Sequence, residues 1–497
     1  MNRSVLLRSL GLRLGAALAL ACSPGCGGGP LPARDGVPAQ APGSGATPTL
    51  GPPMVYELGA ADAEVVAIAF REGQTLLYVT SPGAACGGRG DNSFLSLLVQ
   101  PPEAPRELEE IAVLDLGLGE ATSVAVHPRG DFAVVARKNP QQPDTSPGCL
   151  QAVAGHRVVG RVAVGVGPDS VAVAPNGRFA VVACEGQVPD AEDCPEDGGI
   201  DAAGSIVVVD LRKGPAAMTV AATVEAAEIF ERFFKTEPDR ARVPEDIEPE
   251  FVAIAPDSSF ALVTLQEQSA VAVVTLREAP AGSEDGGVFQ ARLADVILLP
   301  HGFRDASGRV RGVHPDGIAI SPDGALAVTA NESHSKARHL QGLSILDLRA
   351  GPERIKAAAT HPVFELDSSL SAAKTEKTVR KLKRKSRGAA AAPLRAKPKT
   401  TLPRLDPEGI ALARWGTRML AALAIERRAA REEAGSVLIL DITDALAGAA
   451  PARIGRTIVG ATESARPETL AFSPDGRYLF VAAEGDGGTI TMIEIGA

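Results

Sequence analysis

The stretch Gly317–Val328, GIAISPDGALAV, is one copy of a repeat from which the fold of this 497-residue chain can be predicted. Apolar residues alternate on both sides of Ser321-Pro322-Asp323-Gly324, a turn sequence typical of a β-hairpin. The pattern occurs seven times, and the other copies are VVAIAFREGQTLLYV from Val65, SVAVHPRGDFAVV from Ser123, SVAVAPNGRFAVV from Ser170, FVAIAPDSSFALV from Phe251, GIALARWGTRMLAAL from Gly409 and TLAFSPDGRYLFV from Thr469. Such a repeat predicts an array of stacked supersecondary units.

A further strand follows three of these hairpins closely, at Ser205–Asp210, Ser344–Asp347 and Ser436–Asp441. A lone sheet of three or four strands cannot bury both of its faces, so neighbouring sheets must stack. We therefore predict an all-β fold, a seven-bladed β-propeller with inserted loops, and keep a solenoid as the alternative. Ring closure would pair Met54–Leu58 with the blade formed by Thr469–Ile495.

The N-terminus predicts export. Three arginines precede the apolar run Leu14–Ala21, which is too short to span a bilayer as a stable helix. The string Ala19-Leu20-Ala21-Cys22 resembles a bacterial lipobox, in which Cys22 would be acylated, and a Gly/Pro/Ser/Ala-rich tether follows. We expect a signal peptide over 1–21, a tether over 22–53 and the propeller over 54–497, with the mature protein held to a membrane in the cell envelope. A plain signal peptide cut nearby is the alternative.

Export also permits disulfide bonds. Cys184 and Cys194 flank a single excursion and form the natural local pair, whereas the pairing of Cys86 and Cys149 stays open.

Three insertions interrupt the blades. Residues 187–203 are acidic and Gly-rich, which suits a solvated loop or a loop that holds a cation. Within 223–248, Ile229, Phe230, Phe233 and Phe234 stand at helical spacing and predict a short helix packed on the propeller.

The third insertion, 361–404, is strongly basic. Its segment Lys374–Lys399 holds eleven Lys/Arg against the single acid Glu376, and we predict a disordered loop. Such a loop could bind an anionic lipid, lipopolysaccharide or polysaccharide, or fold back on the acidic remainder of the chain. Nucleic acid is not expected, because the protein is exported and the segment lacks aromatic residues for base stacking. We expect a monomer.

Acidic residues recur at two positions of the repeat. The position before the first strand of each hairpin, called the inner row, holds Glu64, Thr122, Asp169, Glu250, Asp316, Glu408 and Glu468. The position after the second strand, called the second row, holds Gly83, Lys138, Glu185, Glu267, Glu332, Glu426 and Glu484. Because the two strands of a hairpin are antiparallel, both rows should lie at one end of the propeller, around the mouth of its central channel.

Crowded carboxylates raise one another's pKa or gather cations, and hard oxygen ligands select calcium or magnesium. We therefore expect a cation site, with calcium as the ion, formed by Glu250, Asp316, Glu332, Glu408 and Glu468. The alternative is structural, since a carboxylate at a strand end can accept backbone N–H bonds from the next blade and lock adjacent sheets together.

Signals of catalysis are few. The chain has no G-x-S-x-G elbow, no H-E-x-x-H and no G-x-x-x-x-G-K phosphate loop. The sequence therefore favours a binding or scaffold module, and no catalytic residue is assigned. A metal-dependent phosphoesterase or other esterase, in which bound metal activates water at the acidic mouth, is the alternative.

The stretch Glu245–Asn331 brings a family resemblance. DIEPEFVAIAPDSSFALVTLQEQSAVAVVTL, ILLPHGF, GVHPDGIAISPDG and VTANES, followed by DPEGIAL from Asp406, resemble the choice-of-anchor I domain, bacterial propellers similar to mesenchyme-specific cell-surface glycoproteins. The resemblance implies an extracytoplasmic surface protein, in some members associated with calcium or mineral and in some described as a phosphatase. Where the family usually continues Ala-Asn-Glu with Gly-Asp, this chain has Ser333-His334.

Overall fold

The computed structural model describes residues 46–59, 62–71, 73–82, 92–143, 145–186, 202–278, 289–299, 301–304, 310–333, 340–367, 405–426, 435–462, 464–485 and 487–496. All of them belong to one compact unit that begins at Gln40. The predicted signal peptide, Cys22, Cys194 and the basic segment Lys374–Lys399 lie outside the described residues.

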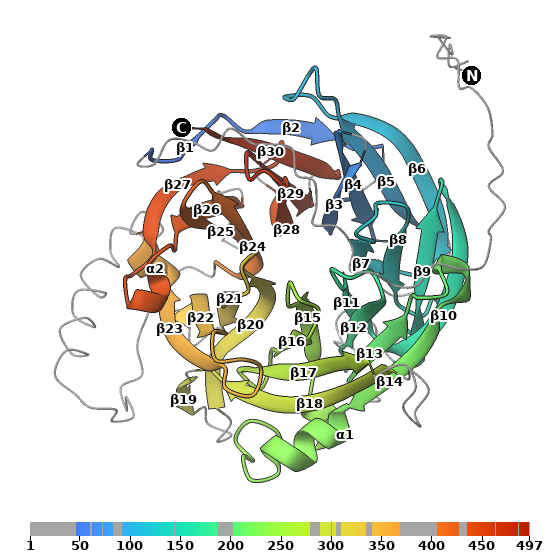
Figure 1. The fold of residues 1–497 in the computed structure, drawn as a ribbon, viewed down its shortest axis with the longest axis vertical. Helices are drawn as coiled ribbons and strands as arrows, with labels where there is room; N and C mark the ends of the chain where they lie inside the picture. Colours follow the sequence, from blue (N-terminus) through green and yellow to red (C-terminus); the bar gives the residue numbers. More distant parts are fainter. Residues whose placement is uncertain are drawn as a thin grey trace. The chain divides into compact units, whose positions relative to one another are not determined.

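The described strands form seven antiparallel sheets, the blades of a β-propeller (Figure 1). Their innermost strands are β3 (Val66–Arg71), β7 (Ala121–Val126), β11 (Pro168–Val173), β15 (Pro249–Ile254), β20 (Val310–Ile320), β24 (Pro407–Trp415) and β28 (Arg466–Phe472). The second strands are β4 (Gln74–Ser81), β8 (Ala133–Arg137), β12 (Phe179–Cys184), β16 (Phe260–Leu265), β21 (Leu326–Ser333), β25 (Arg418–Ile425) and β29 (Tyr478–Glu484). The predicted hairpins are thus the two inner strands of each blade.

The third strands are β5 (Asn92–Gln100), β9 (Pro147–Ala154), β13 (Ser205–Asp210), β17 (Ala270–Glu278), β22 (Gly342–Asp347), β26 (Ser436–Asp441) and β30 (Thr489–Gly496). The outer strands of blades 1 to 6 are β6 (Glu109–Leu118), β10 (Arg157–Val166), β14 (Thr219–Glu225), β18 (Phe289–Leu298), β23 (Lys356–Pro362) and β27 (Ala452–Ile458), and β19 (His301–Arg304) pairs with the start of β20. The three further strands expected from the sequence are β13, β22 and β26.

The ring is closed by both ends of the described chain. The strand β2 (Met54–Glu57) pairs with β30, with Met54 opposite Met492, and β28 of blade 7 contacts β3 of blade 1. This confirms the predicted propeller and its closure, and it excludes the solenoid. A shorter strand, β1 (Thr49–Leu50), pairs with the end of β30, so strand pairing begins before the tether boundary expected at residue 53.

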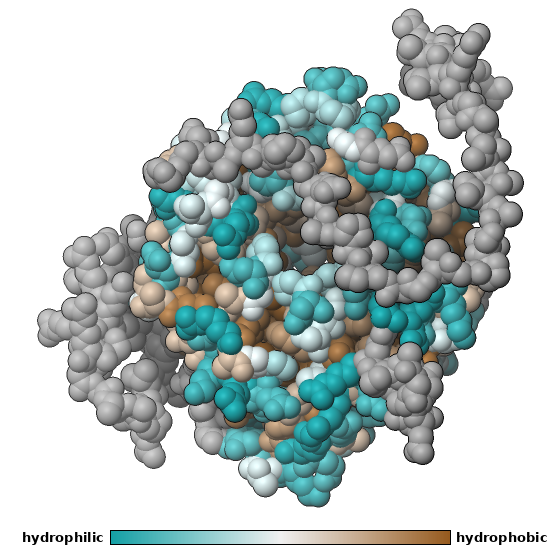
Figure 2. All heavy atoms as spheres, viewed as in Figure 1, coloured by the Kyte–Doolittle hydropathy of each residue, from teal (hydrophilic) through white to brown (hydrophobic). Residues whose placement is uncertain are grey.

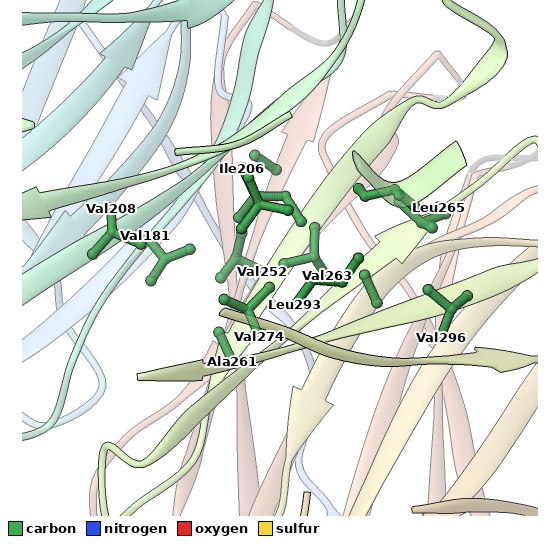
Figure 3. Close-up of a cluster of buried hydrophobic side chains, with 14 of the residues drawn as sticks. Val181, Ile206, Val208, Val252, Ala261, Val263, Leu265, Val274, Leu293 and Val296 are labelled. Carbon is green, nitrogen blue, oxygen red and sulfur yellow. The ribbon is translucent and has the colours of Figure 1, made fainter. Parts of the chain in front are cut away.

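The hydrophobic core lies between adjacent blades. One cluster joins blades 3 and 4 and includes Ile206, Val208, Val252, Val263 and Val274 (Figure 3). Branched and small side chains fill this space because two flat sheet faces meet there, and burial of apolar area supplies most of the driving force. Figure 2 shows hydrophobic residues deep between the blades and hydrophilic residues over the exposed turns.

Adjacent innermost strands are joined by the residue that follows the inner row. Ser123 Oγ accepts a hydrogen bond from Val171 N at 3.2 Å, and Thr469 Oγ1 accepts one from Val66 N at 3.0 Å. In blade 5 this position is Gly317, where an added Cβ would lie 2.6 Å from the Glu408 carbonyl oxygen. Small or hydroxyl side chains here let neighbouring blades approach closely.

The helices are short. They are η1 (Pro215–Ala217), α1 (Ala226–Ile229), the π-helical η2 (Phe230–Phe234), η3 (Pro244–Asp246), α2 (Val363–Leu366) and η6 (Ala445–Ala447). Ile229 and Phe234 are fully buried against blades 3 and 4, which confirms that this insertion packs on the propeller. In the described residues, no helix combines the length and hydrophobicity needed to cross a membrane.

Cys184 differs from its expected role. The structure has it as a free thiol at the end of β12, fully buried in the cluster between blades 2 and 3. Burial raises the pKa of the Cys184 thiol to about 12. The side chain packs into a sheet interface, and its predicted partner Cys194 lies outside the described residues.

Candidate functional site: the carboxylate mouth

The inner row and the second row meet at one end of the channel, as the hairpin geometry requires. Strand β11 begins beside the end of β12, with Pro168 opposite Cys184, and β28 begins opposite the end of β29, with Arg466 opposite Glu484. The innermost strands form a ring (Figure 1), so the starts of these strands and the ends of the second strands recur around one end of it. We call this end of the channel the carboxylate mouth.

Two groups of three carboxylates stand out in the mouth. In each group, one carboxylate oxygen from every residue lies within 4.8 Å of the other two. The first group, called triad 3/4, joins Asp169 on β11, Glu185 after β12 and Glu250 on β15. It therefore spans the junction between blades 3 and 4.

Burial dominates the electrostatics of triad 3/4. Glu185 and Glu250 are 7% and 8% exposed. Burial raises the pKa of Glu185 to about 7, and burial followed by the Glu185 carboxylate raises the pKa of Glu250 well above its usual range. Burial raises the pKa of Asp169 to about 6, with Lys138 opposing the rise. Near neutral pH this junction holds its full negative charge only at a cost in free energy.

The second group, called triad 5/6, has the same arrangement at the junction between blades 5 and 6. Asp316 on β20 and Glu332 on β21 meet Glu408 on β24. Burial raises the pKa of Asp316 to about 7, although a hydrogen bond with Glu408 opposes the rise. Burial also raises the pKa of Glu408 well above its usual range, and Glu332 and Asp316 add to this.

The five residues predicted as one metal site are thus divided among three places. Asp316, Glu332 and Glu408 come together, whereas Glu250 belongs to triad 3/4. Glu468 lies on β28 in neither triad. Burial, and then the carboxylates of Glu484 and Glu426, raise the pKa of Glu468 well above its usual range.

Sequence reasoning missed a third row of the mouth. Two residues before the inner row stand Asp62, Glu120, Gly167, Glu248, His314, Asp406 and Arg466. Arg466 bridges two acids, since its Nη1 lies 3.4 Å from Glu426 Oε1 and its Nη2 lies 3.3 Å from Glu484 Oε2. The signal was present, because these residues stand at the same spacing from the inner row in every repeat.

Lys138 is the basic residue of the second row. Its Nζ lies 3.5 Å from Glu120 Oε2, and Glu185, Asp169 and Glu64 are further charged neighbours. Burial lowers the pKa of Lys138, but these four carboxylates outweigh it and raise the pKa above its usual value.

The six carboxylates of the two triads accept no backbone N–H in the described part of the chain. Their hydrogen bonds are with one another, as between Glu185 and Glu250. The bonds between innermost strands go instead to hydroxyl groups such as that of Ser170, which accepts from Val252 N at 3.3 Å. The alternative considered from the sequence was that these carboxylates lock adjacent blades by accepting backbone N–H bonds. Neighbouring hydroxyl groups accept those bonds instead.

The donor set of each triad suits calcium. Calcium binds oxygen ligands at about 2.3–2.6 Å, so two oxygens on one ion can be up to about 5 Å apart. The oxygens of each triad fall within this limit. Three carboxylates supply between about three and six ligands, and water completes the coordination of about six to eight that calcium takes.

Comparisons with solved structures support the fold. The chain is similar to the periplasmic gluconolactonase of Pseudomonas aeruginosa, with 15% identity, a TM-score of 0.50, and 82% of this chain and 88% of that chain covered. It is also similar to the Cps50 (Swd1) β-propeller domain of Myceliophteria thermophila, with 7% identity, a TM-score of 0.50, and 90% and 100% covered. At such identities the likeness concerns the fold alone.

A search of curated protein sequences gives no match to this chain. The model of one protein family does match it, that of the choice-of-anchor I domain, over residues 66–282. This region covers blades 1 to 3 and part of blade 4, and overlaps the stretch Glu245–Asn331, which carried the resemblance, only in part. Residues 66–282 therefore carry a choice-of-anchor I domain, which confirms the family expected from the sequence.

Proposed function

We propose that this protein is an extracytoplasmic binding or scaffold propeller that binds calcium at the carboxylate mouth. A choice-of-anchor I propeller fits a cell-surface module. The observation that carries the calcium assignment is the convergence of three carboxylates at each of two blade junctions, with oxygens within 4.8 Å of one another.

The physical reason is that the negative charges of each triad are not stabilised by hydrogen-bond donors from outside the triad. Buried carboxylates that receive no donor hydrogen bond from outside their group are destabilised when charged. A divalent cation removes both the repulsion and the desolvation cost, and each triad joins two blades. Calcium would therefore hold neighbouring blades together and stiffen the binding face of the scaffold.

Calorimetric titration of the mature full-length protein with calcium tests this proposal. We expect binding by the wild type and its loss from one site in the triple variant Asp316→Asn, Glu332→Gln, Glu408→Gln, since amides keep the shape but remove the charge. Magnesium should bind more weakly, because it requires a compact octahedral shell.

A matched control removes three charges elsewhere. Glu103, Glu109 and Asp444 are exposed and lie outside the mouth, so their combined change to amides should leave calcium binding unaltered. Absence of binding by the wild type at millimolar calcium, or equal binding by the two triple variants, would contradict the proposal.

The enzymatic alternative uses the same ions. In a metal-dependent phosphoesterase, a cation held by a triad would activate water for attack on a phosphate ester. Turnover of an aryl phosphate that is lost in the triad 5/6 variant would favour the enzyme. Calcium binding without turnover would favour the scaffold.

The proposed placement in the cell rests on Cys22 and the tether. We propose lipidation of Cys22, with the propeller held to the membrane from outside the cytoplasm. Cys22→Ser should release the protein from the membrane fraction. Retention of the variant, with no acyl mass on Cys22 in the wild type, would contradict the anchor.

A further inference from the structure

We propose that Lys138 and Arg466 are built-in counter-ions that stand where cations would otherwise bind, so that the mouth takes up divalent cations at two blade junctions only. This inference rests on the proposed function, because it concerns how many ions the same mouth binds. It is carried by the pairing of acids and bases around the ring.

Every junction between blades brings together three equivalent positions. They are the inner-row and second-row residues of one blade and the inner-row residue of the next blade, as in triads 3/4 and 5/6. At the other five junctions, the same positions hold three acids at 4/5, 6/7 and 7/1 but a single acid at 1/2 and 2/3, so the structure must explain why only two groups form among the described residues.

A side chain with a nitrogen beside an acid occupies four of these five junctions. Lys138 is the second-row residue between blades 2 and 3, 3.5 Å from Glu120. Arg466 holds the second-row acids Glu426 and Glu484, and so serves both the junction 6/7 and the junction 7/1. Between blades 4 and 5, His314 Nδ1 lies 3.3 Å from Glu267 Oε1.

The remaining junction, between blades 1 and 2, has too few acids. Its inner-row residues are Glu64 and Thr122, and its second-row residue is Gly83, which lies outside the described residues. The two junctions left over, 3/4 and 5/6, are the two where three carboxylates converge. The distribution of basic residues therefore separates junctions closed to a cation from open ones.

A second observation points to a cation site at one of these two junctions. Glu185 and Glu250 are more than nine-tenths buried, face one another across triad 3/4, and receive no donor hydrogen bond from any other described residue. At the preceding junction, between blades 2 and 3, the position equivalent to Glu185 is Lys138, whose ammonium group supplies the positive charge directly. At that junction, the lysine ammonium group therefore supplies the positive charge that a bound metal ion would otherwise supply.

Lys138 also has an effect on triad 3/4. Its ammonium group is a charged neighbour of Asp169 and Glu185, whereas the described charged neighbours that act most strongly on Asp316 and Glu408 are all acids. A neighbouring positive charge weakens the binding of a second cation. Triad 5/6 should therefore bind calcium more tightly than triad 3/4.

The test counts calcium ions by calorimetry in the mature full-length protein. We expect about two ions per chain for the wild type, one for each triad. Lys138→Met and Arg466→Met keep an apolar stem but remove the charge. Arg466→Met should add at least one ion, and Lys138→Met should tighten the weaker wild-type site by roughly tenfold.

Matched controls remove the same charges from exposed ion pairs. Lys235 pairs with Glu231, and Arg349 pairs with Asp347, both on the outer surface. Lys235→Met and Arg349→Met should leave the count at about two. An unchanged count and affinity in both mouth variants would overturn the counter-ion role.

The outcomes separate the two proposals. If the wild type binds no calcium, the proposed function fails. The counter-ion role is then decided by metal-free melting, where the mouth variants should lose more stability than the controls at about pH 8, and more than they lose at about pH 5. If a mouth variant does not fold without metal, recovery of its near-UV circular dichroism in millimolar calcium supports the inference, and failure to recover overturns it.

Discussion

The two ends of the propeller use carboxylates in opposite ways. At the turn end, Asp323 accepts hydrogen bonds from Ser321 Oγ at 2.6 Å and Ala325 N at 3.1 Å, and pairs with Arg414 at 3.0 Å. The hydrogen bond from Ser321 leads the effects that lower the pKa of Asp323. At the mouth, Asp316 on the same innermost strand has a pKa raised to about 7 by burial.

The difference lies in the donors and not in the residue type. Asp316 lies near the mouth on β20, and Asp323 lies in the turn that follows this strand, so the strand carries one carboxylate to each end of the blade. At the turn, the carboxylate completes the hairpin. At the mouth, the hydrogen-bond partner of Asp316 is another carboxyl, that of Glu408, and a cation would relieve this crowding of acids.

The largest expected effect of the mouth carboxylates is on the pH dependence of stability. A carboxyl whose pKa is raised by folding stabilises the protein below its unfolded value near about 4, and this stability is lost as the pH rises through the folded value. Metal-free protein should therefore lose stability between about pH 4 and the folded values of about 7 given by Glu185, Asp316 and Glu484. A difference of about one between the folded and unfolded pKa corresponds to about 1.4 kcal/mol, so the effect is several kcal/mol as an upper limit.

Calcium and the amide variant sharpen this prediction. Melting in millimolar calcium should flatten the decline by mass action. The triple variant of Asp316, Glu332 and Glu408 should melt higher than the wild type without metal at about pH 8, and gain less from calcium. A wild type equally stable at about pH 5 and pH 8 without metal would show that the mouth carboxylates are compensated.

The next largest effect on the free energy of unfolding is expected from a change in the packing between blades. Gly317→Ala would place a Cβ 2.6 Å from the carbonyl oxygen of Glu408. Because the obstacle is backbone, we expect a loss of about 1–3 kcal/mol in the free energy of unfolding by urea. In the control Gly496→Ala the nearest atom is Thr49 Oγ1 at 3.4 Å, an ordinary contact. Equal stability of both variants would mean that blades 5 and 6 are not held by close backbone approach.

At the turn end the expected effect is smaller and of opposite sign to that of the mouth amides. Asp323→Ala leaves Ser321 Oγ, Ala325 N and Arg414 without their acceptor. We expect a loss of about 1 kcal/mol near neutral pH, seen as a lower urea midpoint with an unchanged slope. A stabilised variant would show that the charge of the Asp323 carboxylate is no better stabilised by its neighbours than the charges of the mouth carboxylates.

The smallest effect on stability is expected from deletion of residues 369–403. Both ends of this segment are anchored, since Asp367 is buried and pairs with Arg453 at 3.2 Å, and Leu405 N donates to Gln341 Oε1 at 3.2 Å. The deletion variant should keep its melting temperature but lose salt-sensitive retention on an anionic polymer. Unchanged retention would place polyanion binding elsewhere.

Much of the fold could be predicted because the repeat is local in sequence. Alternation around turns such as Ser321–Gly324 defined the hairpins, and Met54–Leu58 was identified as the strand that closes the ring with β30. Family recognition and the helical insertion at Ile229 were confirmed as well.

The grouping of the acids could not be predicted, because it depends on contacts between blades. Alignment gave the inner and second rows, but the pairing of Arg466 with both Glu426 and Glu484 becomes visible only in three dimensions. The direction of Cys184 is a similar case. Proximity in sequence suggested a bridge to Cys194, but the packing of Cys184 against blade 2 depends on strand register and becomes visible only in three dimensions.

The most direct test of the central claim is a crystal structure grown in millimolar calcium, with anomalous difference density collected at a wavelength where calcium scatters. We predict peaks between the carboxylates of triad 5/6 and of triad 3/4, the former better occupied, and none beside Asp323 at the turn end. Density at neither triad, or peaks at the turn aspartate instead, would contradict the account.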